Sequence, residues 1–303
     1  MPVRLENGLA IKGRGLIQAM FMKQVAIIGL GLMGGSLGLA LKRLGHMRVS
    51  AYARRPETRM LALTLGAADS VFDTPQAALQ GADVAVFCTP VCSMPDLARE
   101  CLVAFKPGCV VTDVGSTKAE LVTRMESIFR DTGIYFAGSH PMTGSEKTGM
   151  ESARTDLYED AVVAITPSKT TPDNALKLVA DVWNRVGAHT VQLTPEQHDV
   201  LVARTSHLPH LIAALLAGTS GREVSETQKA FCGPGFKDTT RVAAGSPEMW
   251  HDIVKTNRAA ILVELRHYQS ELGKLISRID QQDYEGVTTI LAHARKCRQQ
   301  LMD

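Results

Sequence analysis

The sequence lacks the features that mark secreted, membrane-spanning or nucleic-acid-binding proteins. Its six cysteines include no C-x-x-C pair and do not form the dense pattern of a disulfide framework. No apolar run approaches the roughly 18 residues of a membrane helix, and the N-terminus has no continuous apolar stretch of the signal-peptide kind. The 33 basic and 31 acidic residues leave a net charge of +2, which gives no electrostatic reason to bind nucleic acid or a membrane. We therefore expect a cytoplasmic protein that binds a small molecule.

The length of 303 residues, 45% of them hydrophobic, predicts two domains. Residues 1–22 are expected to be an N-terminal extension, residues 23–193 a doubly wound α/β domain and residues 194–303 an all-α domain. Wide apolar stripes in the all-α part favour a homodimer. Strands are expected at 25–28, 48–52, 84–88, 109–113, 134–137, 162–166 and 189–192, and helices at 36–44, 56–65, 95–105, 118–129, 173–186, 196–216 and 249–276.

The first predicted strand runs directly into the turn Gly29-Leu30-Gly31-Leu32-Met33-Gly34, which opens a helix. In this pattern Gly29 allows the tight turn, Gly31 lets the backbone approach a pyrophosphate, and Gly34 lets the helix pack on the strand. The helix N-terminus offers N–H donors and a partial positive charge to phosphates. An ordinary glycine-rich turn is the alternative, but a strand, a helix and a βαβ series surround this one. The sequence thus predicts a Rossmann domain that binds a nicotinamide dinucleotide.

The end of the second predicted strand lacks the acid that usually holds the ribose 2′-hydroxyl of NAD. Arg54 and Arg55 stand there instead, and two guanidinium groups suit the 2′-phosphate of NADP. We therefore expect NADP to be preferred, with NAD as the alternative cofactor; solvated surface arginines are the competing interpretation. Thr89, directly after the strand at 84–88, and Ser116 are also placed among the cofactor-binding residues.

Four further segments combine polar groups with turn-forming residues: 113–118, 138–146, 206–210 and 233–241. The first two follow predicted strands, and ligands of parallel sheets gather at the carboxyl ends of strands. We therefore expect Ser116 and His140 to border the cofactor cleft. A lone histidine before proline is more often structural than catalytic.

In these segments the chain resembles the prephenate and arogenate dehydrogenases of tyrosine biosynthesis. The resemblance covers nearly everything after residue 22 and rests on Asp-x-Gly-Ser-x-Lys, Ser-His-Pro-Met-x-Gly-x-Glu, Ser-His-Leu-Pro-His and a glycine-rich run ending in Lys-Asp-x-Thr-Arg. It implies oxidative decarboxylation of a cyclohexadienol, with hydride transfer to NAD(P). It also implies an all-α dimerisation domain after the Rossmann domain.

The resemblance assigns roles to individual residues. His140 is the base that accepts the hydroxyl proton, and Ser116 either bonds the same hydroxyl or orients His140. Arg241 is the clamp for a substrate carboxylate, because its planar fork matches a carboxylate bidentately. Asp238, three residues earlier, is expected to pair with Arg241 if the segment is helical. A purely structural ion pair is the alternative for these last two residues.

Further substrate-binding residues follow from the same resemblance. His210 matches the substrate-binding histidine, with His207 as a packing or orienting neighbour on the same side of a helix that Pro209 kinks. Glu146 and Trp250 match positions that line the substrate site, and Trp250 is interpreted as a contribution from across a dimer interface. Two histidines three residues apart also suggest zinc, but no third ligand stands at suitable spacing, and we expect no metal.

Three alternatives remain at this point. Arogenate differs from prephenate by an amine in place of a keto group, and the sequence does not show which residue faces that group. A β-hydroxyacid dehydrogenase shares the glycine turn and the helical second domain, but its Lys and Asn pair does not stand out. A dinucleotide sensor without catalysis is disfavoured by Ser116, His140 and Arg241 together. No separate mutase or regulatory domain is expected within the 303 residues.

Overall fold

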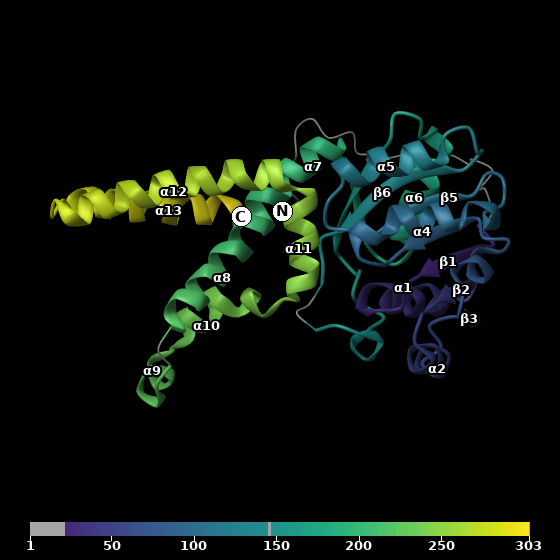
Figure 1. Ribbon diagram of the computed structural model, residues 1–303, viewed down its shortest axis with the longest axis horizontal. Helices are drawn as coiled ribbons and strands as arrows, with labels where there is room; N and C mark the ends of the chain where they lie inside the picture. Colours follow the sequence, from purple (N-terminus) through teal and green to yellow (C-terminus); the bar gives the residue numbers. More distant parts are fainter. Residues whose placement is uncertain (1–21, 145–146, 223, 303) are drawn as a thin grey trace.

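The computed structural model describes residues 22–144, 147–222 and 224–302, arranged as a sheet domain and a helical domain (Figure 1). The strands are β1 (Gln24–Ile28), β2 (Arg48–Tyr52), β3 (Ser70–Phe72), β4 (Val84–Phe87), β5 (Val110–Asp113), β6 (Tyr135–Pro141), β7 (Val162–Pro167) and β8 (His189–Gln192). The helices among them are α1 (Leu32–Arg43), α2 (Pro56–Thr64), α3 (Pro75–Leu79), α4 (Met94–Glu100), α5 (Ala119–Phe129) and α6 (Asp173–Arg185).

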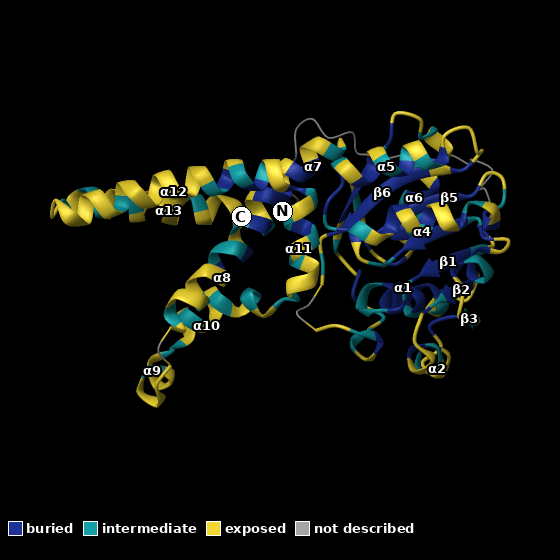
Figure 2. Cartoon of the chain, in the orientation of Figure 1, coloured by how far each residue is buried: buried dark blue, intermediate teal, exposed yellow. Residues whose placement is uncertain are grey.

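The eight strands form one sheet in the order β3-β2-β1-β4-β5-β6-β7-β8, which is the doubly wound arrangement that the sequence predicts. Alternate residues of β1 serve the two faces: Val25 and Ile27 join the core under α1 and α6, whereas Ala26 and Ile28 join the core under α4 and α5. Figure 2 shows this burial as a dark layer between exposed helix surfaces. Both faces of the sheet are therefore covered, as apolar strands require.

The sheet is parallel except at one pairing. Strand β7 runs antiparallel to β6, with His140 opposite Ala164, because no helical crossover spanning the sheet connects these two strands. The same pairing extends β6 to Pro141, four residues beyond the predicted strand end. His140 consequently lies inside a strand and not in the loop after it, and its pairing with β7 fixes its backbone.

The helical domain follows β8 without another strand among the described residues. Its helices are α7 (Pro195–Val202), α8 (Leu208–Ser220), α9 (Glu226–Phe231), α10 (Pro234–Thr240), α11 (Pro247–Thr256), α12 (Arg258–Asp280) and α13 (Tyr284–Met302). The five-residue π-helical segment Ala203–His207 joins α7 to α8, where the sequence predicts a proline kink. The segment predicted at 249–276 is divided at Asn257. The long α12–α13 hairpin projects away from the sheet domain (Figure 1).

The continuous helical stretch Pro195–Ser220 has the length and mean hydropathy, 1.4, of a membrane-spanning helix, which the sequence interpretation overlooked. That interpretation looked for an unbroken apolar run, whereas a mean tolerates polar residues within the stretch. Here the stretch carries His198, Asp199, His207 and His210, all buried against other parts of the protein. Only 28% of its apolar 18-residue window is buried among the described residues, and Leu201 and Leu215 are exposed.

Candidate active site

The glycine turn forms a tight junction between β1 and α1. Gly29 has a φ of +110°, which favours glycine, and its N–H donates to the carbonyl of Tyr52 at 3.0 Å. A Cβ on Gly34 would lie 2.0 Å from the carbonyl oxygen of Gly29, so a side chain there is excluded. These are the two mechanical reasons for which the sequence predicts glycine at these positions.

The surroundings of the turn fit a dinucleotide. No atom lies within 4 Å of the position of a Cβ on Gly31, so the backbone is open to an approaching group. Helix α1 has no side-chain cap and no acid in its first turn, which leaves its N-terminal N–H groups for an anion. The buried hydroxyl of Thr89, beside the turn, has no hydrogen-bond partner among the described residues. An open backbone, an uncapped helix and an unpaired hydroxyl suit pyrophosphate and ribose oxygens.

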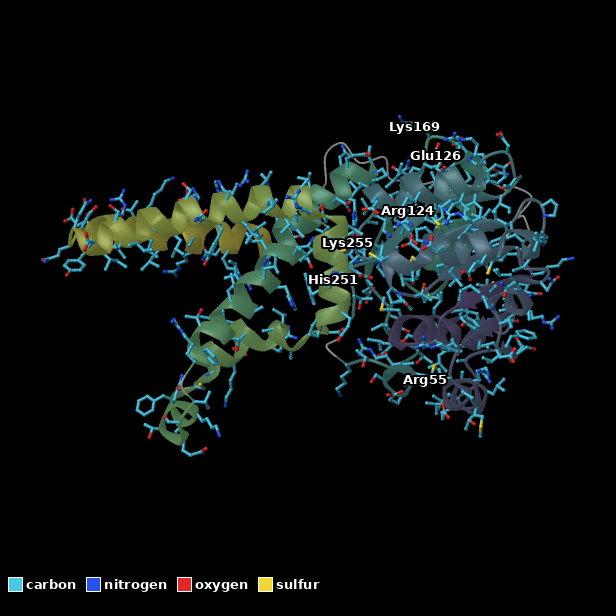
Figure 3. The ribbon with its side chains drawn as sticks, viewed as in Figure 1. Arg55, Arg124, Glu126, Lys169, His251 and Lys255 are labelled. Atoms are coloured by element: carbon cyan, nitrogen blue, oxygen red, sulfur yellow. The ribbon has the colours of Figure 1, made fainter. Side chains whose placement is uncertain are left out.

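The two arginines of the predicted cofactor site lie just after the end of β2. Arg54 and Arg55 are exposed, and neither forms an ion pair with a described residue. The guanidinium of Arg59 donates to the carbonyls of Ala53 and Arg54, which holds this turn in shape. Arg55 directly precedes α2 and is its N-cap residue (Figure 3).

The carboxylate of Asp113, at the end of β5, holds two loops together. It accepts the N–H of Gly115 at 2.7 Å and the N–H of Ser139 at 3.0 Å, so it joins the residue before Ser116 to the residue before His140. The ammonium of Lys118 pairs with the same carboxylate, and both side chains are fully buried. Each side chain compensates the buried charge of the other, so removing either one would leave an unpaired charge in the interior. Asp113 thereby fixes the spacing of the two predicted catalytic residues.

Ser116 lies half-buried in the loop that Asp113 holds. No hydrogen bond joins it to His140 or to another side chain among the described residues, so the expectation that Ser116 orients His140 finds no support. The position of Ser116 at the carboxyl end of β5 is compatible with its other expected role toward substrate and cofactor.

The ring of His140 is held by a residue of the helical domain. Its Nδ1 lies 2.9 Å from Nε2 of His198, and Nδ1 of His198 lies 2.8 Å from the carboxylate of Asp199. Asp199 also accepts the backbone N–H groups of Lys118 and Ala119 at 2.8 and 2.9 Å, at the start of α5. The result is a buried chain from the beginning of α5 through two imidazoles to β6.

His140 is neutral in this setting. Burial holds the pKa of His140 well below its usual value near 6.5, and the neighbouring His198, Lys118 and His207 act in the same direction. Nδ1 is occupied by the contact with His198, whereas no described residue hydrogen-bonds Nε2. A neutral imidazole with one uncommitted nitrogen has the form that a general base requires.

Asn257, at the junction of α11 and α12, sets the state of a further histidine. Its amide nitrogen donates to the backbone carbonyl of Asp199 at 2.8 Å and lies 3.2 Å from Nδ1 of His207. Because a carbonyl can only accept, the amide orientation is fixed and Nδ1 of His207 must accept as well. The proton of neutral His207 therefore sits on Nε2, a buried atom without a partner among the described residues.

A hollow of about 290 Å³ opens beside this histidine cluster, and Arg241, His210, Trp250 and Gly144 contribute to its wall. The ring of His210 stacks on that of Trp250, with centroids 3.5 Å apart and planes 13° from parallel. Gly144 follows His140 by four residues, so the segment that leaves β6 contributes to the wall. The structure thus brings the predicted substrate-binding residues Arg241, His210 and Trp250 together. The volume of the hollow suits a small molecule.

Comparisons with known proteins agree with this arrangement. The nucleotide-binding domain of prephenate dehydrogenase matches residues 37–192, and the dimerization domain of the same family matches residues 194–293. The chain belongs to the prephenate dehydrogenase family. The two matched segments meet where β8 ends and α7 begins.

Individual relatives of this family cover most of both chains. A cyclohexadienyl dehydrogenase of Zymomonas mobilis is 34% identical over 91% of this chain and 95% of its own length. The structure of a prephenate dehydrogenase from A. aeolicus, in complex with hydroxyphenyl propionate and NAD+, is 31% identical with a TM-score of 0.86, covering 93% of this chain and 99% of its own. That of a Synechocystis arogenate dehydrogenase is 27% identical with a TM-score of 0.77, covering 91% and 99%.

Three predicted substrate-binding residues remain: Asp238, Trp250 and Glu146. Asp238 is exposed on α10, and no ion pair joins it to Arg241 among the described residues, because α10 ends at Thr240 and Arg241 begins a separate 3-10 turn. Trp250 stacks on His210 of its own chain, and its expected contribution across a dimer interface stays a prediction. Glu146 lies outside the described residues.

The sequence reasoning missed the residues that support the predicted ones. Asp113 and Lys118 stand within a motif that it quoted, but their pairing and their hold on Ser139 are tertiary. His198 and Asp199 lie in a predicted helix, and only an unusual pair of polar residues on its buried side marks them. Asn257 carries no local signal beyond its place at the division of a long helix. In the part of the chain that the structure describes, no cluster of three His, Cys, Asp or Glu side chains is arranged to hold a metal.

Proposed function

We propose that the chain oxidatively decarboxylates a cyclohexadienol, with prephenate and arogenate as its two candidate substrates. The observation that carries this proposal is the placement of a neutral, buried His140 at the sheet edge that holds the glycine turn, beside a hollow containing Arg241. A bound nicotinamide dinucleotide supplies the hydride acceptor. Membership of the prephenate dehydrogenase family supports the reaction, and a cyclohexadienyl dehydrogenase among the relatives supports acceptance of both substrates.

The protein's own residues provide the remaining chemistry. Nε2 of His140 accepts the proton of the ring hydroxyl while hydride leaves the carbon that bears it. The bond to the ring carboxylate then breaks, CO2 leaves, and the electron pair makes the ring aromatic. His140 returns its proton to the phenolate oxygen, so the balance of protons closes. Arg241 holds the carboxylate that remains on the side chain, and His210 and Trp250 form the wall against which the ring packs.

The cofactor proposed for this site is NADP. Arg54 and Arg55 are exposed cations at the end of β2, and Ala53 stands where an acid would repel a 2′-phosphate. Gly29 bonds to the carbonyl of Tyr52, which brings this turn next to the pyrophosphate cradle. We further propose a cytoplasmic homodimer formed through the helical domain.

Initial rates with prephenate and arogenate, each with NAD and NADP, test the proposal in one four-way comparison. We expect activity with at least one substrate and a higher kcat/KM with NADP than with NAD. His140→Asn should lower kcat by about 10² or more with little change in dinucleotide binding. A loss of less than threefold would remove His140 from its role, no turnover with either substrate would favour a binding protein, and a tenfold preference for NAD would refute the choice of cofactor.

A further inference from the structure

The proposed reaction uses His140 but not His198 or Asp199, the two residues hydrogen-bonded in series behind it. The order of donors and acceptors in this series is fixed. The carboxylate of Asp199 accepts two backbone N–H groups, from Lys118 and Ala119, so both of its oxygens are acceptors and the group is held in place. Nδ1 of His198 must therefore donate to it. A neutral imidazole that donates through Nδ1 accepts through Nε2, so Nδ1 of His140 donates in turn.

We infer that His198 and Asp199 are positioning residues for the base: they fix the tautomer of His140 and stabilise the proton it receives. The contacts leave Nε2 of His140 without a proton, which is the form that can accept one from the hydroxyl. After the transfer Nδ1 of His140 still donates to His198, so the carboxylate of Asp199 stabilises the positive charge of His140 through this hydrogen-bonded relay, with no proton passed to Asp199. This inference rests on the proposed function of His140 as the base.

The groups around His140 explain why such support matters. Lys118 from the loop before α5, His198 from α7 and His207 from the π-helical segment all disfavour a proton on His140, and so does burial. The carboxylate of Asp113 is already committed to Lys118. Asp199 is the carboxylate that the hydrogen bonds through His198 connect to His140. The relay also couples the two domains, because its acid and middle histidine belong to α7 and its base to β6.

Two substitutions at 198 separate the tautomer role from packing. His198→Gln retains an amide oxygen that accepts from Nδ1 of His140, whereas His198→Phe fills the space without an acceptor. We expect His198→Phe to lower kcat by about 10² or more and His198→Gln to retain a substantial part of the activity. Dinucleotide affinity should stay within threefold of the parent in both. Equal kcat for the Phe variant and the parent would overturn the inference.

The charge role is tested with Asp199→Asn. We expect kcat to fall by about 10² or more and the acid limb of the kcat/KM profile to move to lower pH, because His140 loses the charge that favours its proton. The matched control is Asp83→Asn, whose carboxylate likewise accepts two backbone N–H groups, from Lys23 and Gln24, at 2.7 and 2.9 Å, at the opposite end of the strands. The control should keep the kcat and pH profile of the parent even where it lowers the melting temperature.

The outcomes separate this inference from the function on which it rests. If His140→Asn keeps kcat within threefold, the role of His140 itself fails. If His140→Asn is inactive but Asp199→Asn and His198→Phe both keep the parent's kcat and acid limb, only the positioning role is wrong. Should Asp199→Asn not fold, the comparison of Gln with Phe at position 198 still decides, since neither change touches the start of α5.

Discussion

At the scale of single residues, His207 shows how a buried imidazole is kept neutral. Burial lowers the pKa of His207 to about 4, the nearby His198 and His210 contribute, and the carboxylate of Asp199 opposes the shift. The amide of Asn257 donates to Nδ1, so only Nε2 carries a proton. Protonation at low pH would set two donors against each other at this contact. The folded protein therefore resists a charge on His207 that the unfolded chain accepts.

This difference predicts an acid-sensitive stability. From pH about 6.5 down to about 4 the unfolded chain binds a proton that folded His207 does not, so the free energy of unfolding falls as pH falls through that window. The loss from this one group is of the order of 3 kcal/mol. His207→Gln keeps an acceptor for Asn257 but does not titrate, and it should show a smaller loss in urea unfolding between about pH 7 and about pH 5. The same change at exposed His46 is the control; an unchanged loss in the His207 variant would contradict the prediction.

The candidate site could be predicted from the sequence only where a residue stands in a conspicuous segment. His140, Ser116 and Arg241 lie among glycines, prolines and polar residues, and those segments suggest a site. His198 and Asp199 lie in a regular helix, and the contact between His198 and His140 spans 58 residues of sequence. Their roles come from the packing of α7 against the sheet domain, which no local pattern encodes. The predicted pair of Asp238 and Arg241 does not form, because it requires one helix to contain both residues and α10 ends at Thr240.

At the scale of elements, the apolar periodicity predicted the long strands and helices and missed the short ones. Strand β3 has three residues and α3 has five, too few for a period of 2 or 3.6 to stand out. The extension of β6 through His140 depends on its pairing with β7, which the sequence of β6 alone does not contain. The glycine turn was predictable in detail because its geometry is local.

That turn predicts different results for two alanine substitutions. Gly34→Ala places a Cβ 2.0 Å from the carbonyl oxygen of Gly29, so α1 must shift, at a cost of about 1–3 kcal/mol, and dinucleotide affinity falls. Gly31→Ala meets no protein atom within 4 Å and should cost less than about 1 kcal/mol, yet its methyl group occupies the approach of the pyrophosphate. We expect both variants to bind NADP at least about tenfold more weakly by fluorescence titration, and only Gly34→Ala to melt well below the parent. Tight binding by Gly31→Ala would place the phosphates elsewhere.

At the scale of the whole molecule, the two domains differ in how completely they bury apolar side chains. The sheet domain encloses its core on both faces, whereas the α12–α13 hairpin is largely exposed along its length (Figure 2). On α12, Tyr268, Leu272, Ile276 and Ile279 are exposed at spacings of four, four and three residues, which places them in one stripe. A stripe of this kind on a projecting hairpin is the surface that a dimerisation domain offers to a second copy.

The stripe predicts a homodimer that charge disrupts. Leu272→Lys combined with Ile276→Lys places two cations in the middle of the apolar surface, and two copies would bring four together without a compensating acid in the stripe. We expect light scattering to give twice the chain mass for the parent at micromolar concentration and a single chain mass for the double variant. Ser270→Lys adds a cation to the opposite side of α12 and should remain dimeric. A parent that is monomeric at that concentration, or a double variant that stays dimeric, would show that copies do not associate through this stripe. Because the base relay of Asp199, His198 and His140 lies within one chain, loss of the dimer should leave the acid limb of the kcat/KM profile in place.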